Sequence, residues 1–322
     1  PAGPADLRLI TEAPYNQMGA QLDMNNLAIV NLAEPVGAAD AATKAYVDAL
    51  GGTNYQKTYW VSSLDGSDAN NGSFNKPFKT IQKAVNVAPN DADAIIYLMH
   101  SITEPDLTIN KTKITIQGVG GFDSQAILLY SRVIIQGAST TRVRFKDVQI
   151  RTYGLAGGGV PLTIDGTQGR HKFDNVTLYP ANGNKAFEII GSIPANFWFE
   201  FIDSAIMGAM DLGGTLAGAA SLTFRQCSDW GMKINVNAPW LVALVDIQRM
   251  GKLTHTAGTV VMRNVHGIEA DGGVCIESTA PLAAGNALLL SAVNFQQANL
   301  SYGKINKTGA CAWALDTCNH NV

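Results

Sequence analysis

Apolar and polar residues alternate in short runs along most of this chain, and turn residues separate the runs from Ile95 onward. A four-residue pattern recurs in these runs: an apolar residue, any residue, then Asp, Asn or Gln, and usually a second apolar residue. The pattern occurs at residues 145–148, 173–176, 201–204, 224–227, 244–247, 262–265 and, more loosely, 292–295. Its polar positions are Asp147, Asn175, Asp203, Gln226, Asp246, Asn264 and Asn294, which follow one another in steps of 28, 28, 23, 20, 18 and 30 residues.

Strands separated by such steps are typical of the coils of a parallel β-solenoid. One coil cannot bury its apolar face alone, but stacking at about 4.8 Å aligns equivalent residues into interior ladders. We expect each polar residue of the pattern at a bend, where a short polar side chain can bond the backbone of the turn. A sandwich or barrel would need tight hairpins, and neither Asn71-Gly72 nor Asn182-Gly183 lies tightly between two alternating strands. The pattern therefore predicts an all-β parallel β-helix.

One amphipathic helix precedes the strands, and its apolar residues share one face at helical spacing. They are Phe78, Ile81, Ala84, Val85 and Ala88. A single helix ahead of a long strand array suits a cap over the end of the solenoid. We divide the chain into an N-terminal attachment segment (1–52), a first strand with the capping helix (53–94), the coils (95–300) and a C-terminal tail (301–322).

Charged residues make up only 15% of the 322 residues, against about 25% in an ordinary globular protein. Residues 205–300 hold 11 of them, 5 basic and 6 acidic. We therefore expect the middle and late coils to form an apolar subunit interface. The apolar residues Leu212, Leu216, Trp240, Leu241 and Leu288 are not all expected to fit inside a single solenoid.

The net charge of −3 and the scattered Lys and Arg residues argue against nucleic acid as a partner. No run of apolar residues reaches the length of a membrane span, so no membrane insertion is expected.

Two segments resemble known proteins. Residues 22–48 resemble the short repeat of bacteriophage tail fibres, through Leu22, Met24, Ile29, Asn31, Leu32, Pro35, Asp40, Ala41, Lys44, Tyr46 and Val47. Residues 59–85, YWVSSLDGSDANNGSFNKPFKTIQKAV, are similar to the start of the pectate-lyase-like right-handed β-helix of phage tailspikes and many polysaccharide-acting enzymes.

This resemblance implies a homotrimeric virion protein of the phage tail, extracellular when it functions. Its N-terminal region would join other tail or baseplate proteins, and its right-handed β-helix would attach to a bacterial surface glycan or receptor. One alternative is a polysaccharide depolymerase, a glycoside hydrolase or lyase, on the same β-helix. Another is a purely structural fibre or baseplate connector.

A glycosidase needs two carboxylates about 5 to 9.5 Å apart. Asp147, Asp203 and Asp246 lie two coils apart in sequence order, so stacking would separate each pair by roughly 9 to 10 Å. Glu200 lies beside this series and is a further candidate. The same aspartates are also explained without catalysis as bend residues, which is the interpretation we prefer.

Exposed aromatic residues are the candidates for sugar binding. They are Trp198, Trp230, Trp240, Tyr153 and Tyr179, with Asp229 beside Trp230. Trp230 is the first choice because it should lie near a loop. The dispersed Cys and His residues predict no metal site and no cofactor, and Cys311 and Cys318 could close a short loop or remain thiols. Residues 64–72, LDGSDANNG, resemble a calcium loop superficially and are better explained as a turn.

Overall fold

The computed structural model describes residues 56–90, 92–119, 127–137, 140–166, 168–181, 185–194, 197–217, 220–228, 233–248, 251–265, 274–281, 286–293 and 304–316, with 33, 35, 36, 40–43 and 46. The chain divides into two compact units, Pro1–Thr53 and Asn54–Val322. The attachment segment expected over 1–52 lies largely outside the described residues. The following account concerns the second unit.

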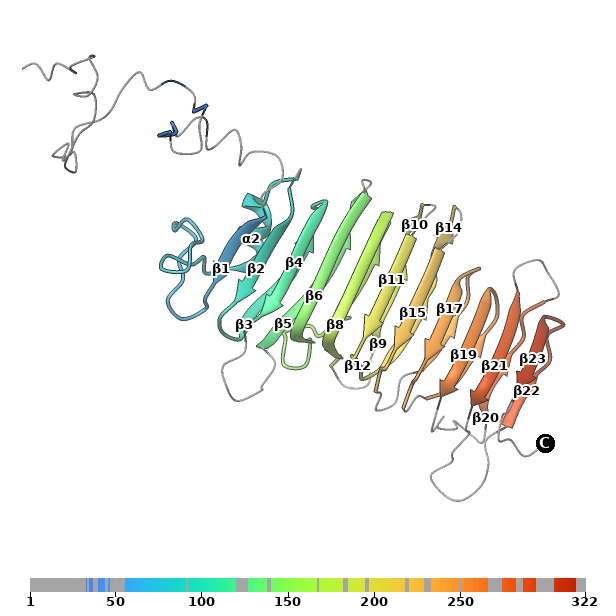
Figure 1. Cartoon of the computed structure of the whole chain (residues 1–322). Helices are drawn as coiled ribbons and strands as arrows, with labels where there is room; N and C mark the ends of the chain where they lie inside the picture. Colours follow the sequence, from blue (N-terminus) through green and yellow to red (C-terminus); the bar gives the residue numbers. More distant parts are fainter. Residues whose placement is uncertain are drawn as a thin grey trace, which may run out of the picture. The chain divides into compact units, whose positions relative to one another are not determined.

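This unit is a parallel β-helix in which each coil contributes a strand to the same long sheet (Figure 1). Every strand of this long sheet pairs in parallel with its counterpart in the next coil. Its strands are β1 (Lys57–Val61), β2 (Ala94–Leu98), β4 (Lys113–Gly118), β6 (Thr140–Arg151), β8 (Gln168–Tyr179), β11 (Phe197–Ile202), β15 (Ala220–Arg225), β17 (Leu241–Val245), β19 (Thr259–Val265), β21 (Ala287–Val293) and β23 (Ala312–Asp316).

A second sheet runs alongside it, again with parallel pairs from coil to coil. Its strands are β3 (Ile102–Ile109), β5 (Ile127–Gln136), β7 (Leu162–Asp165), β9 (Lys185–Ile190), β13 (Ala209–Leu212), β16 (Ile234–Val236), β18 (Leu253–His255), β20 (Val274–Ser278) and β22 (Lys304–Lys307). The short strands β10 (Ser192–Ile193) and β14 (Thr215–Leu216) form a separate parallel pair.

A third sheet closes the coil. The first residues of β5 pair with the last residues of β6, which pair in turn with the end of β8 and then with β12 (Ala205–Ile206). The long strands β6 and β8 therefore continue through a bend from the long sheet into the third sheet. The named strands pair only in parallel among the described residues, so the predicted solenoid is confirmed and the sandwich is excluded.

The interior is built from the first apolar residue of the repeated pattern. Phe145, Phe173, Phe201 and Phe224 are fully buried and lie in register on successive strands. Their ring centroids are 5.4, 4.9 and 5.3 Å apart, close to the spacing of neighbouring strands. Leu244, Met262 and Leu290 continue the same column. The predicted interior ladder is thus confirmed.

The polar residue of the pattern lies at the bend, as expected, and its backbone is left-handed. Values of φ between 48 and 56° occur at Asp147, Asn175, Asp203, Gln226, Asp246 and Asn264. The seventh predicted bend residue, Asn294, was wrong. The left-handed residue of that coil is Ala292, with φ 53°. Its neighbours Ser291 and Val293 pair with Arg263 and Val265, which flank the bend of the previous coil. The step from Asn264 is therefore 28 residues, and the apparent match at Asn294 arose because alanine carries no polar side chain to mark the bend.

The predicted helix is α2 (Ile81–Val87), which lies at the β1–β2 end of the coils (Figure 1). Ile81, Ala84 and Val85 are buried in the core. The Glu104 carboxylate, from β3, accepts hydrogen bonds from the backbone N–H groups of Ile81 and Gln82, both over 2.9 Å. The helix is thus fixed to the first coils by its apolar face and by its N-terminus.

Of the five apolar residues that were not all expected to fit inside the solenoid, only Leu241 is exposed, at 47%. Leu212, Trp240 and Leu288 are fully buried, and Leu216 packs against the core. Composition alone does not distinguish an inward from an outward residue of the same strand, so the interior takes up more of these side chains than their number suggested.

Candidate functional site

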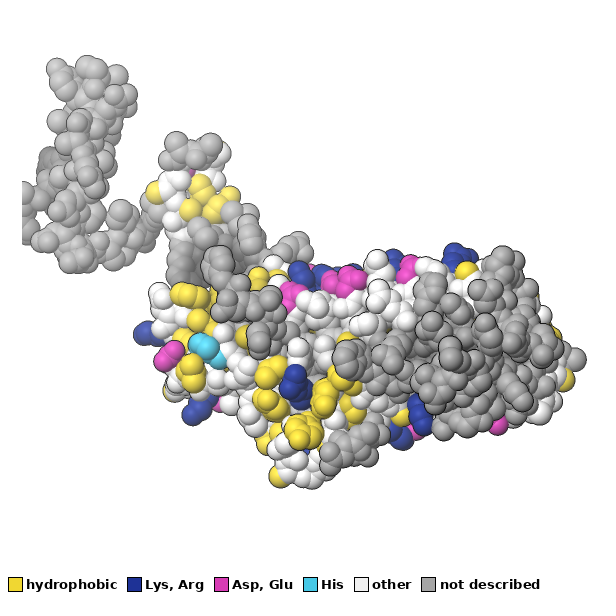
Figure 2. All heavy atoms as spheres, turned by 90° about the horizontal axis from the view of Figure 1, so that it is seen from below, with side chains coloured by type: hydrophobic (Ala, Val, Ile, Leu, Met, Phe, Trp, Pro, Cys, Tyr) yellow, Lys and Arg dark blue, Asp and Glu magenta, His cyan; other side chains and the backbone are white. Residues whose placement is uncertain are grey.

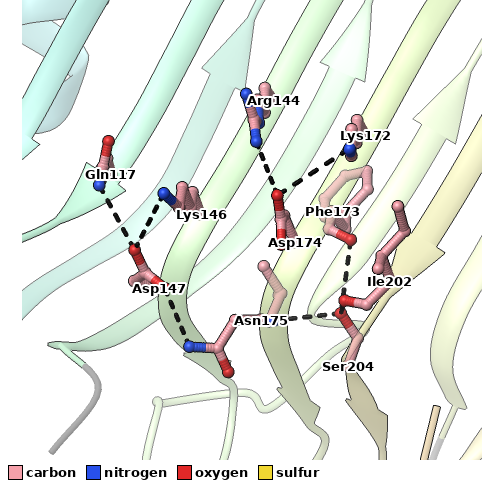
Figure 3. Close-up of polar contacts among 11 residues, drawn as sticks. Gln117, Arg144, Lys146, Asp147, Lys172, Phe173, Asp174, Asn175, Ile202 and Ser204 are labelled. Carbon is pink, nitrogen blue, oxygen red and sulfur yellow. Dashed lines mark hydrogen bonds and ion pairs between the residues drawn. The ribbon is translucent and has the colours of Figure 1, made fainter. Parts of the chain in front are cut away.

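The aspartates proposed from the sequence lie at the bends and bond across coils. Asn175 Nδ2 donates to Asp147 Oδ1 over 2.9 Å, and Asn264 Nδ2 donates to Asp246 Oδ1 over 2.7 Å. Gln117 Nε2 lies 3.4 Å from the second oxygen of Asp147 (Figure 3). Asp203 has the same backbone conformation. These contacts give the aspartates a structural role, and the residues are spaced along the solenoid without converging.

Charged side chains cover the outer face of the long sheet in the early coils. Arg144 Nη2 lies 2.6 Å from Asp174 Oδ2, and Lys172 Nζ lies 3.9 Å from the same oxygen (Figure 3). Lys146 Nζ lies 3.9 Å from Asp147 Oδ2. Asp174 immediately precedes the polar position of the repeated pattern and was not singled out from the sequence.

Glu200, the fourth carboxylate candidate, belongs to this charged surface but is 6% exposed. Its Oε1 atom lies 3.6 Å from Arg225 Nη2 on β15, and Lys172 is its opposite partner on β8. A carboxylate with so little water needs nearby positive charge. Arg225 supplies it, so Glu200 has an electrostatic role within the sheet surface.

Two carboxylates that the sequence analysis missed are neighbours on the second sheet. Glu188 on β9 and Asp211 on β13 are direct partners in register. Lys185 Nζ lies 2.5 Å from Asp211 and 3.6 Å from Glu188. The hydrogen bond to Asp211 is the main cause of a raised pKa for Lys185, which remains protonated. The pair lies outside the repeated pattern, so only the register of the coils brings it together.

A row of aromatic and basic residues lies on the outer face of the third sheet and on the turn after β6. Tyr130 pairs in register with Arg151, and Arg151 pairs with Tyr179. The Arg151 guanidinium lies 5.3 Å from the Tyr179 ring centroid, and Tyr153 packs edge-on against Tyr179 with 54% of its surface exposed. Figure 2 shows an apolar patch around a basic side chain on this side of the molecule. We call these four residues the tyrosine row.

Two of the predicted sugar-binding residues, Tyr179 and Tyr153, belong to the tyrosine row. The predicted tryptophans do not belong to it. Trp198 is half-buried on the outer face of β11. Trp240 was wrong as a ligand candidate, because it is fully buried and packs against Phe197. Trp230 and Asp229 lie outside the described residues. Tyr130 and Arg151 could not be predicted as members of a site, because only the stacking of successive coils brings them side by side.

The buried histidines and the acidic loop are structural. Burial lowers the pKa of His171 to about 3, so this side chain is neutral among Phe197 and Phe199. Asp68, in the segment similar to a calcium loop, accepts hydrogen bonds from the backbone N–H groups of Lys79 and Thr80. Within the described ranges no group of three His, Cys, Asp or Glu residues could hold a metal ion.

The remaining sequence expectations concern cysteines and membrane spans. Cys311 is buried, with its Sγ atom 3.6 Å from Ser278 Oγ, and Cys318 lies outside the described residues. No helix in the described part of the chain is long and apolar enough to cross a membrane.

Comparison with known proteins finds a resemblance in fold. No family model matches the chain, and no curated protein matches it in sequence. Among solved structures, pectin methylesterase PemA from Erwinia chrysanthemi is similar with a TM-score of 0.48 and 14% identity, over 77% of this chain and 92% of that one. The parallel β-helix itself follows from the strand pairings described above.

Proposed function

We propose that this protein is an attachment protein whose β-helix binds a glycan or receptor on a bacterial surface. The tyrosine row carries the proposal. Tyrosine rings present an apolar face with a polar edge, and an arginine beside them supplies hydrogen-bond donors in a fixed plane. Sugars offer apolar C–H faces and hydroxyl groups to both. A partly exposed cluster of this composition is typical of an interaction site.

The experiment measures retention of the purified protein on immobilised bacterial surface polysaccharides and on the cells that carry them. We expect the variant Tyr153→Ala/Tyr179→Ala to lose about tenfold or more in affinity, since Tyr179 presents its ring on the third sheet and Tyr153 packs against it from the turn after β6. The matched control is Tyr97→Ala, on the outer face of the long sheet. Binding of no surface polymer by the wild type, or equal binding by wild type and tyrosine-row variant, would contradict the proposal.

The resemblance of residues 22–48 to tail-fibre repeats supports a finer form of this proposal. The protein would be a homotrimeric tail fibre or tailspike subunit of a virion, joined through its N-terminal region to other tail or baseplate proteins. Helix α2 would cap the end of a right-handed solenoid. Supporting the trimer, an apolar row lies on the outer face of the late coils: Ala243, Val261, Leu289 and Ala314 are partners in register on β17, β19, β21 and β23.

One observation favours the alternative of a polysaccharide depolymerase. Glu188 and Asp211 are register partners on neighbouring strands, and strands about 4.8 Å apart allow two such carboxyl groups the separation of about 5 to 5.5 Å that retaining glycosidases need. Release of reducing ends from a bound polysaccharide, abolished by Glu188→Gln or by Asp211→Asn, would support it. Retention of the polysaccharide without release of reducing ends would favour attachment alone, and no retention would favour a structural connector.

A further inference from the structure

A row of positive charge crosses three neighbouring strands of the long sheet. Lys113 on β4 pairs in register with Arg142 on β6, and Arg142 pairs with Arg170 on β8. The next partner along the row is Trp198 on β11. Neighbouring strands are about 4.8 Å apart, so these four side chains form a continuous track parallel to the solenoid axis.

The charge of the two arginines on this track is not balanced by a nearby carboxylate of the described residues. Like charges directly opposite each other in a sheet are destabilising. Among the described residues no carboxylate lies within 4.0 Å of the Arg142 or Arg170 guanidinium, and both side chains are exposed. Lys113 has a 3.9 Å contact with Asp93. An anionic ligand on the track would remove the repulsion between the two arginines.

The overall charge of the chain restricts which polyanion fits the track. The net charge of −3 disfavours the closely spaced phosphates of a nucleic acid, whereas a uronic-acid polymer carries fewer charges along its length. Asp174 and Glu200 lie on the same face of the long sheet, on β8 and β11. They are already paired with Arg144 and Arg225, so they do not neutralise the arginines of the track.

We propose that the track formed by Lys113, Arg142, Arg170 and Trp198 binds a linear acidic polysaccharide that extends along the solenoid axis. The arginines bind carboxylates of the polymer through paired hydrogen bonds, and the indole of Trp198 packs against a sugar ring. The track lies on the long sheet and the tyrosine row on the third, so this site is separate from the one that carries the proposed function.

The experiment uses the full chain and three immobilised probes: hyaluronate, uncharged dextran and single-stranded DNA. We expect binding to hyaluronate at about 0.1 M salt, weak binding to dextran and DNA, and loss of hyaluronate binding at about 1 M salt, where charges are screened. The variant Arg142→Ser/Arg170→Ser should bind hyaluronate at least about tenfold more weakly. The control Lys76→Ser/Lys79→Ser removes the same charge from the exposed segment before α2 and should bind like the wild type.

Thermal unfolding distinguishes a lost site from a damaged fold. Hyaluronate should raise the Tm of the wild type and leave that of Arg142→Ser/Arg170→Ser unchanged, while the variant alone should be as stable as the wild type or more stable. Absence of hyaluronate binding, equal loss in the control, or tighter binding to DNA would overturn the inference. Failure of this site leaves the tyrosine row untouched, because the Tyr153→Ala/Tyr179→Ala variant tests that site alone.

Discussion

The left-handed residue at the bend recurs in successive coils, and it explains why the repeated pattern favours Asp and Asn. Side chains with a Cβ atom are strained in this conformation, while Asn and Asp adopt it more readily than most residues. Asn175 and Asn264 also donate their amide hydrogens to the aspartate of the preceding bend. Backbone conformation and side-chain bonding thus select the same residue types.

Replacing a bend residue by a β-branched one should destabilise the coil stack. We expect Asn175→Val to lower the free energy of unfolding by about 2 kcal/mol, and Asn175→Gly to lower it by less than about 1 kcal/mol, because glycine adopts positive φ freely. Urea denaturation measures both. The control Thr254→Val lies in strand β18 of the second sheet, and a loss in the control as large as that of Asn175→Val would contradict the explanation.

The buried His171 makes stability depend on pH in a defined window. Its pKa is about 3 in the folded chain, below its ordinary value of 6.5, so below pH 6.5 the unfolded chain binds a proton that the folded chain does not. The contribution of His171 to the free energy of unfolding should therefore fall by about 1.4 kcal/mol for each pH unit from 6.5 towards 3.

The variant His171→Phe tests this dependence, since a phenyl ring suits the aromatic surroundings of Phe197 and Phe199. Free energies of unfolding measured between pH 7.5 and 4 should fall less steeply for the variant than for the wild type by about 1.4 kcal/mol per pH unit. Identical slopes would show that His171 takes up its proton before unfolding.

At the scale of elements, helix α2 is the exception in a β-fold. Its amphipathic pattern was sufficient to predict it, and Ile81, Ala84 and Val85 are buried as expected. Glu104 could not be predicted, because it accepts hydrogen bonds from two N–H groups at the helix N-terminus from a strand more than twenty residues away. Burial raises the pKa of Glu104, while these backbone hydrogen bonds oppose the rise.

Removing the Glu104 carboxylate should weaken the attachment of α2. Glu104→Ala leaves the buried N–H groups of Ile81 and Gln82 without their acceptor, at an expected cost of about 2 to 3 kcal/mol. Faster amide exchange at these two residues would locate the effect. In contrast, Glu277→Ala breaks a more exposed ion pair with Lys252 and should cost less than about 1 kcal/mol; equal costs would argue against a helix-specific role.

For the whole molecule, the apolar row on β17, β19, β21 and β23 is the feature expected to govern assembly. We expect the wild type to be a trimer, and Val261→Lys/Leu289→Lys to be a monomer, because two charges would be buried without partners at the interface. Light scattering coupled to size-exclusion chromatography measures the mass. The control Thr58→Lys/Thr115→Lys adds two charges to the outer face of the same sheet in the early coils, far along the solenoid from the apolar row, and should remain trimeric. A monomeric wild type would contradict the predicted trimer.

Sequence alone was enough to predict the solenoid, six of its seven bends, the interior column and helix α2, because each depends on residues close together in the chain or on repetition of one local pattern. It could not determine which outward residues meet. The coils differ in length, with steps of 18 to 28 residues between bends, so the partners of Tyr130, Arg142 or Glu188 follow only from the pairing register. Tertiary structure alone assembled the tyrosine row, the basic track and the Glu188–Asp211 pair, and it placed Trp240 inside, because stacking decides which side of each strand faces the core.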